Sequence, residues 1–223
     1  KTLTALDSDI KKAQQALFNT RSTEPCMRNA LTYSLILPEM EGGISVLDMK
    51  KAMVAQIKDA YEHLISSQKT ITDIGMKKIK KNMVIYTHCH STTVTSILKA
   101  AKTSRVPFIV HNTETRPRYQ GRKTAEELAK AGIHVEHYVD SGMVYALKKA
   151  DLVLLGVDAI TAEGFVANKI GTATAVELAK RHDIPVYFCT DSWKFDPSTI
   201  KGSHEEIECR DPREVWDKPP KDV

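Results

Sequence analysis

Five short, mostly apolar runs, each followed by polar residues, alternate with helical patterns across residues 83–189 and limit the folds that this chain can adopt. Continuous apolar runs are typical of strands that are covered on both faces of a sheet. Their alternation with helices indicates an α/β fold with a Rossmann-like, doubly wound parallel sheet. The expected strands are Met83–Tyr86, Phe108–His111, His134–Val139, Leu152–Val157 and Val186–Cys189, and the expected helices are Thr92–Lys102, Thr124–Ala131, Ser141–Lys149 and Thr172–Arg181.

Residues 1–82 have a different pattern, which predicts a small helical N-terminal domain before a Rossmann-like domain at 83–223. Pro25 suits the first turn of a helix. Glu41-Gly42-Gly43 is expected to break the chain. The expected helical segments are a stripe through Leu3, Leu6, Ile10 and Leu17, the run Cys26–Leu37, the run Val46–Ser67 with Met49, Met53, Ile57, Tyr61 and Leu64 on one face, and the run Ile71–Lys81.

Charge and cysteine usage narrow the class of protein. The formal net charge is +4 without a dense Lys/Arg block, which favours an anionic small molecule over nucleic acid as the partner. The four cysteines are widely spaced and form no C-x-x-C pair, which argues against a disulfide scaffold and a structural zinc site. No apolar run reaches the length of a membrane span. We therefore expect a cytoplasmic protein with no membrane partner.

The stretch Val84–Ser91, V-I-Y-T-H-C-H-S, is the first candidate site. An apolar strand ends there in polar residues just before a helix, and ligands of open parallel sheets bind beyond the carboxyl ends of the strands. The following helix N-terminus and the flanking His88 and His90 are expected to favour a Cys89 thiolate. The alternative is a small buried cysteine under a loop. Two histidines at this spacing are a weak metal signal, so no metal is predicted.

Polar residues also follow the second and third strands. Arg116 and Arg118 suit a phosphate group, because guanidinium forks bind phosphate oxygens in pairs, although solvated surface charge is the alternative. Glu114 is interpreted as a loop brace. Asp140 and Ser141 are interpreted as N-cap residues of the helix that follows them.

Asp158 closes the almost wholly apolar run L-V-L-L-G-V-D. Partial desolvation would raise the pKa of its carboxyl and suit it to general-acid work, and the alternative is a cap for residues 159–162. The segment Gly164–Thr172, G-F-V-A-N-K-I-G-T, follows directly. Asn168 and Lys169 stand there beside an expected helix N-terminus, a plausible anion site, although the lysine could equally extend to solvent.

The remaining marked residues receive structural interpretations. Cys26 and Cys189 are expected in the core, and Cys209 is expected in a late strand. Trp193 is expected to pack beside the loop after the fifth strand. His134 and His137 are expected on an exposed strand face.

Six motifs together resemble one superfamily in order and spacing. Its members are the archaeal ribose-1,5-bisphosphate isomerases, the 5-methylthioribose-1-phosphate isomerases and the regulatory subunits of translation initiation factor 2B. T-R-S-T at 20–23 and E-I-E-C-R-D-P-R-E-V at 206–215 are most similar to the first group. The motifs are T-H-C-H-S at 87–91, T-E-T-R-P-R-Y-Q-G at 113–121, V-D-S at 139–141, G-V-D-A-I-T at 156–161, N-K-I-G-T at 168–172 and W-K-F at 193–195.

This resemblance implies an aldose–ketose isomerase that converts alpha-D-ribose 1,5-bisphosphate to ribulose 1,5-bisphosphate in AMP degradation, without a cofactor. It implies Cys89 and Asp158 as the catalytic residues and a dimer-based homo-oligomer, such as a hexamer. Methylthioribose-phosphate isomerisation and a non-catalytic regulatory module that binds sugar phosphates are the alternatives. The substrate contacts that it implies are Arg21, Ser91, Arg116, Asn168, Lys169 and Lys194.

Two family segments have no counterpart in this chain. The family's amino-terminal R-G-A phosphate loop would precede Lys1, and its N-P-x-F-D-x-T-P-P segment would follow Pro220. Both ends are therefore expected to be cut from something longer.

Overall fold

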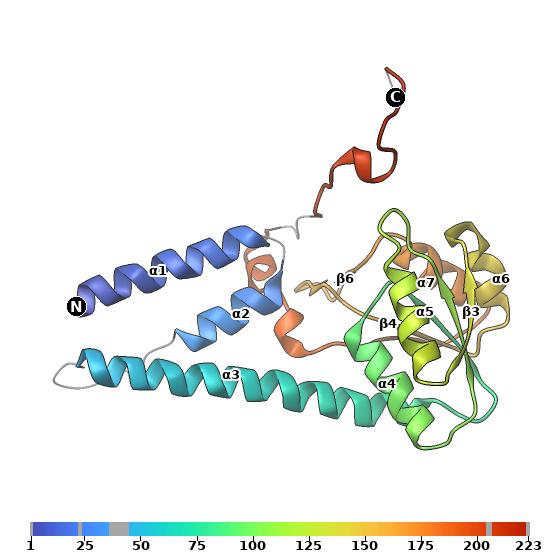
Figure 1. Cartoon of the computed structure of the whole chain (residues 1–223), viewed down its shortest axis with the longest axis horizontal. Helices are drawn as coiled ribbons and strands as arrows, with labels where there is room; N and C mark the ends of the chain where they lie inside the picture. The colour runs from blue at the N-terminus through green and yellow to red at the C-terminus, as the bar shows by residue number, and fades with distance from the viewer. Residues whose placement is uncertain (1, 22–23, 36–44, 204–206, 222–223) are drawn as a thin grey trace. The chain divides into compact units, whose positions relative to one another are not determined.

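The computed structural model describes residues 2–21, 24–35, 45–203 and 207–221 (Figure 1). The expected break at Glu41-Gly42-Gly43 lies outside these residues. The chain divides into two compact units. The first comprises residues 1–67, 158–167 and 191–207, and the second comprises residues 68–157, 168–190 and 208–223.

A five-stranded parallel sheet forms the centre of the second unit. Its order, β3-β2-β1-β4-β7, is that of a Rossmann-like sheet, so the predicted fold class is confirmed. The chain moves outward from β1 to β3 and then returns to the other side of β1, which makes the carboxyl ends of β1 and β4 the topological switch point. The strands are β1 (Val84–His88), β2 (Ile109–Thr113), β3 (His134–Tyr138), β4 (Leu152–Leu155) and β7 (Val186–Phe188).

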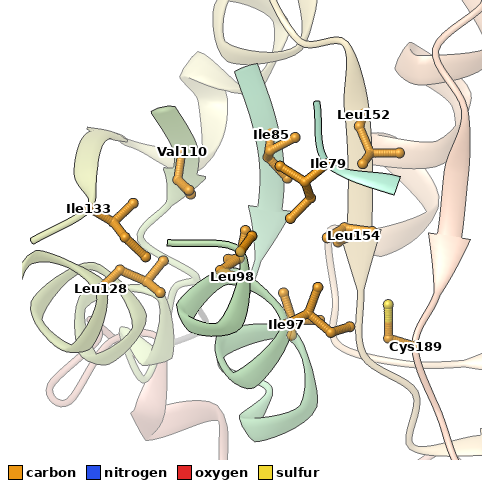
Figure 2. Close-up of a cluster of buried hydrophobic side chains, with 12 residues drawn as sticks. Ile79, Ile85, Ile97, Leu98, Val110, Leu128, Ile133, Leu152, Leu154 and Cys189 are labelled. Atoms are coloured by element: carbon orange, nitrogen blue, oxygen red, sulfur yellow. The ribbon is translucent and has the colours of Figure 1, made fainter. Parts of the chain in front are cut away.

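Helices cover both faces of this sheet, and each face has its own core. On one face, α4 (Thr92–Thr103) and α5 (Gln120–Lys130) pack on β1, β2 and β4 through a cluster that includes Ile85, Ile97 and Leu154 (Figure 2). On the other, α6 (Met143–Lys148) and α7 (Thr172–Arg181) pack against Tyr86 and neighbouring residues. Burial on both faces explains why the strand sequences are mostly apolar.

The helical segments of the N-terminal region are α1 (Leu3–Thr20), α2 (Pro25–Ser34) and α3 (Val46–Gly75), the last continued by the 3-10 turn η1 (Met76–Lys78). The separation into helices at 46–67 and 71–81 is wrong, because α3 continues through residues 68–70 without a break. The sequence S-S-Q-K-T at 66–70 contains no glycine or proline, so nothing in it stops the helix. No described helix is long and apolar enough to span a membrane.

Residues after β4 form small elements that the sequence pattern did not reveal. A two-stranded antiparallel hairpin pairs β5 (Ala159–Ile160) with β6 (Val166–Ala167). The alternative role of Asp158, as a cap for residues 159–162, does not apply, since a strand begins at Ala159. Cys209 is exposed and lies in no strand, which corrects the expected late strand. The 3-10 turns after β4 are η3 (Ser192–Lys194), η4 (Pro197–Lys201) and η5 (Pro212–Glu214), and a further one, η2 (Asp140–Gly142), lies between β3 and α6.

Candidate active site

Cys89 occupies a strained turn directly after β1. Its backbone φ is +67°, in the left-handed region that residues with a side chain adopt at a cost. The Cys89 N–H donates to Thr115 Oγ1 at 2.9 Å, and the Cys89 carbonyl accepts from Thr124 Oγ1 at 2.8 Å. The backbone N–H and carbonyl of Cys89 are thus both hydrogen-bonded to side chains from other parts of the unit. Strained backbone that is held in this way is typical of functional sites.

Asp140 holds the backbone of Thr115, the residue whose hydroxyl supports the Cys89 turn. Thr115 also has a positive φ, +62°, and its N–H donates to Asp140 Oδ1 at 2.8 Å. The N–H of Arg116 donates to Asp140 Oδ2 at 2.7 Å. Asp140 therefore braces the loop after β2, and no side-chain capping bond links it to its own helical turn or to α6. The N-cap interpretation of Asp140 and Ser141 is wrong.

Hydrogen bonding assigns His88 one neutral tautomer. Its Nε2 lies 2.7 Å from the carbonyl oxygen of Ile170, which can only accept, so Nε2 carries the proton. Its Nδ1 lies 2.6 Å from Thr113 Oγ1 and accepts from that hydroxyl, which in turn accepts from Tyr86 Oη at 3.0 Å. Burial lowers the pKa of His88, with only a partly opposing contribution from the bond to Ile170.

His90 is held as the opposite tautomer. Because the Thr124 hydroxyl donates to the Cys89 carbonyl, its oxygen accepts from His90 Nδ1 at 3.0 Å, and this nitrogen carries the proton. Nε2 lies 3.8 Å from Glu127 Oε2 and makes no hydrogen bond with the described residues. Burial lowers the pKa of His90 as well. Neither histidine therefore brings positive charge to Cys89 at neutral pH, contrary to expectation.

Ser91 caps the helix that follows the turn. Its side chain accepts from the N–H of Val94 at 3.4 Å at the start of α4. Gly156, just after β4, approaches it so closely that an added Cβ would lie 2.9 Å from Ser91 Oγ. Ser91 therefore has a structural role beside its proposed contact with substrate.

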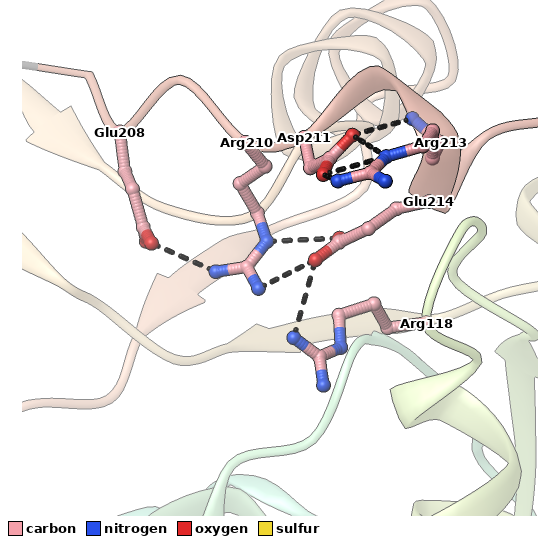
Figure 3. A network of polar contacts seen from close by, with 6 residues as sticks. All are labelled: Arg118, Glu208, Arg210, Asp211, Arg213 and Glu214. Atoms are coloured by element: carbon pink, nitrogen blue, oxygen red, sulfur yellow. Dashed lines mark hydrogen bonds and ion pairs between the residues drawn. The ribbon is translucent and has the colours of Figure 1, made fainter.

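The two arginines after β2 contact the C-terminal segment of the same unit. Arg116 Nη2 donates to the Val215 carbonyl at 3.0 Å, and Arg118 Nη1 lies 3.3 Å from Glu214 Oε1 (Figure 3). Arg210 contacts the same Glu214 carboxylate at 2.7 Å and 2.9 Å. Glu114 pairs with Arg122 at 2.9 Å, in keeping with its interpretation as a brace.

The segment Asn168–Gly171 leads into α7. Asn168 Nδ2 donates to Thr172 Oγ1 at 3.0 Å, and the Lys169 carbonyl accepts from the Thr172 N–H at 3.0 Å. Gly171 is the N-cap residue of α7 and has a φ of +96°. Lys169 is half-buried, and its ammonium group contributes to the lowered pKa of His88. The predicted anion-binding pair therefore stands at a helix N-terminus, where anions are favoured.

The other predicted site residues belong to the first unit. Asp158 is half-buried, and its N–H donates to the Ala167 carbonyl at 2.9 Å across the β5–β6 hairpin. Arg21 and Lys194 share one counterion, Glu24, at 3.2 Å and 2.5 Å. Lys194 follows Trp193, whose ring stacks on His63 with centroids 4.2 Å apart. Asp158 lies in the first unit, and Cys89 lies in the second.

Sequence reasoning missed three supporting residues, namely Thr115, Thr124 and Glu24. Of these three, only Thr115 had a signal in the sequence, because it lies in T-E-T-R just after an expected strand. The other cysteines differ from Cys89 in setting. Burial raises the pKa of the Cys189 thiol to about 11, as suits the expected core residue. Cys26 is only half-buried.

The fold and the site define a class of proteins with a Rossmann-like sheet and a cysteine-bearing turn at its switch point. Residues 1–222 match the model of the Initiation factor 2 subunit family. The chain belongs to that family.

Similar proteins come from several branches of the family. The chain is 40% identical over 221 residues to ribose 1,5-bisphosphate isomerase of Pyrococcus furiosus, covering 98% of this chain and 68% of that protein. It is 34% identical over 220 residues to methylthioribose-1-phosphate isomerase of Heliobacterium modesticaldum, covering 94% and 64%. The crystal structure of Pyrococcus horikoshii OT3 translation initiation factor eIF-2B is similar with a TM-score of 0.78 and 25% identity, covering 88% and 68%.

The chain thus spans about two thirds of the length of the curated relatives that it matches. Further archaeal proteins named ribose 1,5-bisphosphate isomerase are 32–39% identical to it.

Proposed function

We propose that the protein is an aldose–ketose isomerase that converts alpha-D-ribose 1,5-bisphosphate to ribulose 1,5-bisphosphate in AMP degradation. The observation that carries the proposal is the 40% identity, over almost the whole chain, to a protein named for this reaction. The strained Cys89 turn supports it, because the reaction needs a reactive group that is held rigidly beside a sugar.

In the proposed mechanism, Asp158 protonates the ring oxygen as the bond from that oxygen to C1 breaks. C1 becomes electrophilic, and the freed ring oxygen becomes a hydroxyl. The hydrogen on C2 then moves to C1, and the hydroxyl on C2 loses its proton to become the ketone. C2 is oxidised and C1 is reduced, so the two sugars are isomers and no external oxidant or reductant takes part.

Cys89 would act in the hydrogen transfer. As a thiolate it would take the C2 proton and leave an enolate-type intermediate, whereas in the other route a hydride passes directly from C2 to C1 and Cys89 relays the hydroxyl proton. Substrate with deuterium at C2 separates the routes. Deuterium retained in the product supports hydride transfer, and exchange with water supports the enolate.

Arg21, Ser91, Arg116, Asn168, Lys169 and Lys194 are proposed to bind the substrate. The location of Lys169 beside the N-terminus of α7 supports a phosphate contact there. The pairing of Arg21 and Lys194 with one carboxylate supports a second cationic group. Holding both phosphates would place the sugar carbon atoms, and such positioning is a large part of many rate enhancements.

The test is turnover and binding of two sugar phosphates by the natural full-length protein and two variants. Cys89→Ser and Asp158→Asn are each expected to lower kcat by about 100-fold or more, the scale of a lost acid–base group, with binding retained. Near-normal turnover in either variant would contradict the assigned role. The matched control is Cys209→Ser, which changes an exposed thiol.

The same assay also tests the two alternative functions found in the family. Preference for methylthioribose 1-phosphate would identify the activity named in the Heliobacterium relative. Binding of either sugar phosphate without turnover would identify a regulatory module. We further propose that the protein works in the cytoplasm as a dimer-based homo-oligomer, such as a hexamer.

A further inference from the structure

We propose that His88 is a positioning residue whose Nε2–H group clamps the Asn168–Gly171 segment against the Cys89 turn. The role rests on the proposed function only in that Asn168 and Lys169 are taken to bind the substrate. The clamp itself is a property of the second unit and is tested separately from turnover.

The clamp joins two stretches that are distant in sequence. His88 ends β1 and immediately precedes Cys89, while Ile170 lies 82 residues later, just before α7. His88 is only 2% exposed, so the donor end of the 2.7 Å bond from its Nε2 to the Ile170 carbonyl is shielded from water. A bond from a buried ring to a loop carbonyl restricts the backbone that carries Lys169.

The other side of the ring is fixed as well. Thr113 donates to Nδ1, and Tyr86, itself fully buried, donates to Thr113. Because Thr113 donates to Nδ1, that nitrogen is unprotonated, and the ring proton of His88 is on Nε2. If the relay ran in the opposite direction, the Tyr86 hydroxyl proton would have no acceptor among the described residues. The relay therefore presents a donor to Ile170.

Gly171 shows how closely the segment is held. A Cβ at this residue would lie 2.7 Å from His88 Nε2 and 3.0 Å from its Cε1. The φ of +96° also favours glycine. The imidazole and the backbone at Gly171 therefore pack without room for a side chain. His88 thus fixes the position of the residue at which α7 begins.

Substitution of His88 by two residues with side-chain amides tests the roles of its two ring nitrogens separately. In His88→Gln the amide nitrogen replaces Nε2 and can donate to Ile170, whereas in His88→Asn the amide group reaches only the position of Nδ1. Amide hydrogen exchange of residues 168–176 is measured in the ligand-free protein. We expect exchange at least tenfold faster in His88→Asn, and restoration to within about threefold of wild type in His88→Gln.

The kinetic readout uses ribose 1,5-bisphosphate. His88→Asn should raise KM at least tenfold and change kcat by less than about threefold, and His88→Gln should restore KM. If the wild-type protein turns over neither sugar phosphate, the proposed function fails, whereas the exchange rates still decide the clamp. Faster exchange with unchanged KM would overturn the positioning role.

The tautomer of His88 can also be measured directly in the wild-type protein. Ring ¹⁵N chemical shifts of His88 should report a protonated Nε2 and an unprotonated Nδ1, with a slowly exchanging Nε2 proton. The opposite tautomer would overturn the proposal, as would unchanged or equally accelerated exchange in the two variants.

Discussion

At the scale of single residues, the two histidines beside Cys89 differ in which ring nitrogen is protonated. His88 uses both nitrogens in hydrogen bonds, whereas His90 keeps a buried, unprotonated Nε2 that faces Glu127. Both are neutral at neutral pH because burial disfavours the imidazolium. Neither ring therefore places a positive charge beside the Cys89 thiol at that pH.

The lowered histidine pKa values predict how stability depends on pH. In the unfolded chain a histidine takes up a proton below about pH 6.5, while the folded His88 resists it. Its contribution to the free energy of unfolding is thus complete above that pH and is lost as pH falls toward the folded pKa. Asp140 and Lys169 act on His88 with opposite signs.

Urea unfolding at pH 7.5, 6.5 and 5.5 tests this. Wild type should lose stability across the series, and His88→Gln should lose less, because glutamine has no proton to gain in this range. The remaining loss in His88→Gln belongs largely to His90, which faces Glu127, Lys123 and Lys99. Equal losses in the two proteins would contradict the prediction.

The misinterpreted residues show where sequence reasoning stops. Asp140 and Ser141 precede a helix, and this local pattern is typical of an N-cap. The actual partners of Asp140 are the backbone N–H groups of Thr115 and Arg116, 25 and 24 residues earlier. Only the pairing of β2 with β3 brings them together. The placement of Cys89 beyond β1 was predictable, since it follows from strand and helix alternation alone.

At the scale of elements, long periodic segments were predictable and very short ones were not. The five strands and the helix Thr172–Arg181 follow from their apolar patterns. The hairpin of β5 and β6 has two residues in each strand, too few to show an alternation. The single helix α3 was divided in the prediction because its polar middle interrupts the apolar stripe, although every residue there permits a helix.

A proline substitution tests the continuity of α3. Lys69 is exposed and lies in the stretch that the sequence pattern assigned to a break between helices. Lys69→Pro should cost about 3 kcal/mol in the free energy of unfolding, because it removes an interior helix bond and clashes with the preceding turn. Lys69→Ala is the control and should be close to neutral. A cost below about 1 kcal/mol for the proline would indicate two separate helices.

At the scale of the whole molecule, the Rossmann-like parallel sheet and the family were predictable, while the division into two units was not evident from composition. The chain leaves and re-enters each unit several times, so contiguous sequence does not delimit them. Side chains on α3 illustrate a related limit. Met49 and Ala60 are buried, whereas Val54, Ile57 and Tyr61 on the same helix are exposed. Hydropathy alone did not separate these groups.

The proposed homo-oligomer is tested by sedimentation of the natural full-length protein across a range of concentrations. A dimer or a multiple of it is expected. Ile57→Glu, on the exposed side of α3, tests whether this helix takes part in the interface, and Ala55→Glu, also exposed on α3, is the control for the added charge. A monomer at all concentrations would contradict the proposal.

The contact between His88 and Gly171 also restricts how this protein can change. A larger residue at 171 has no room while the imidazole is present, and a smaller residue at 88 leaves a gap beside residue 171. Single replacements at either position are therefore penalised, whereas a paired exchange escapes the steric part of the penalty. Residues 88 and 171 should accordingly vary together among related sequences, and a redesign of the loop before α7 has to begin from both.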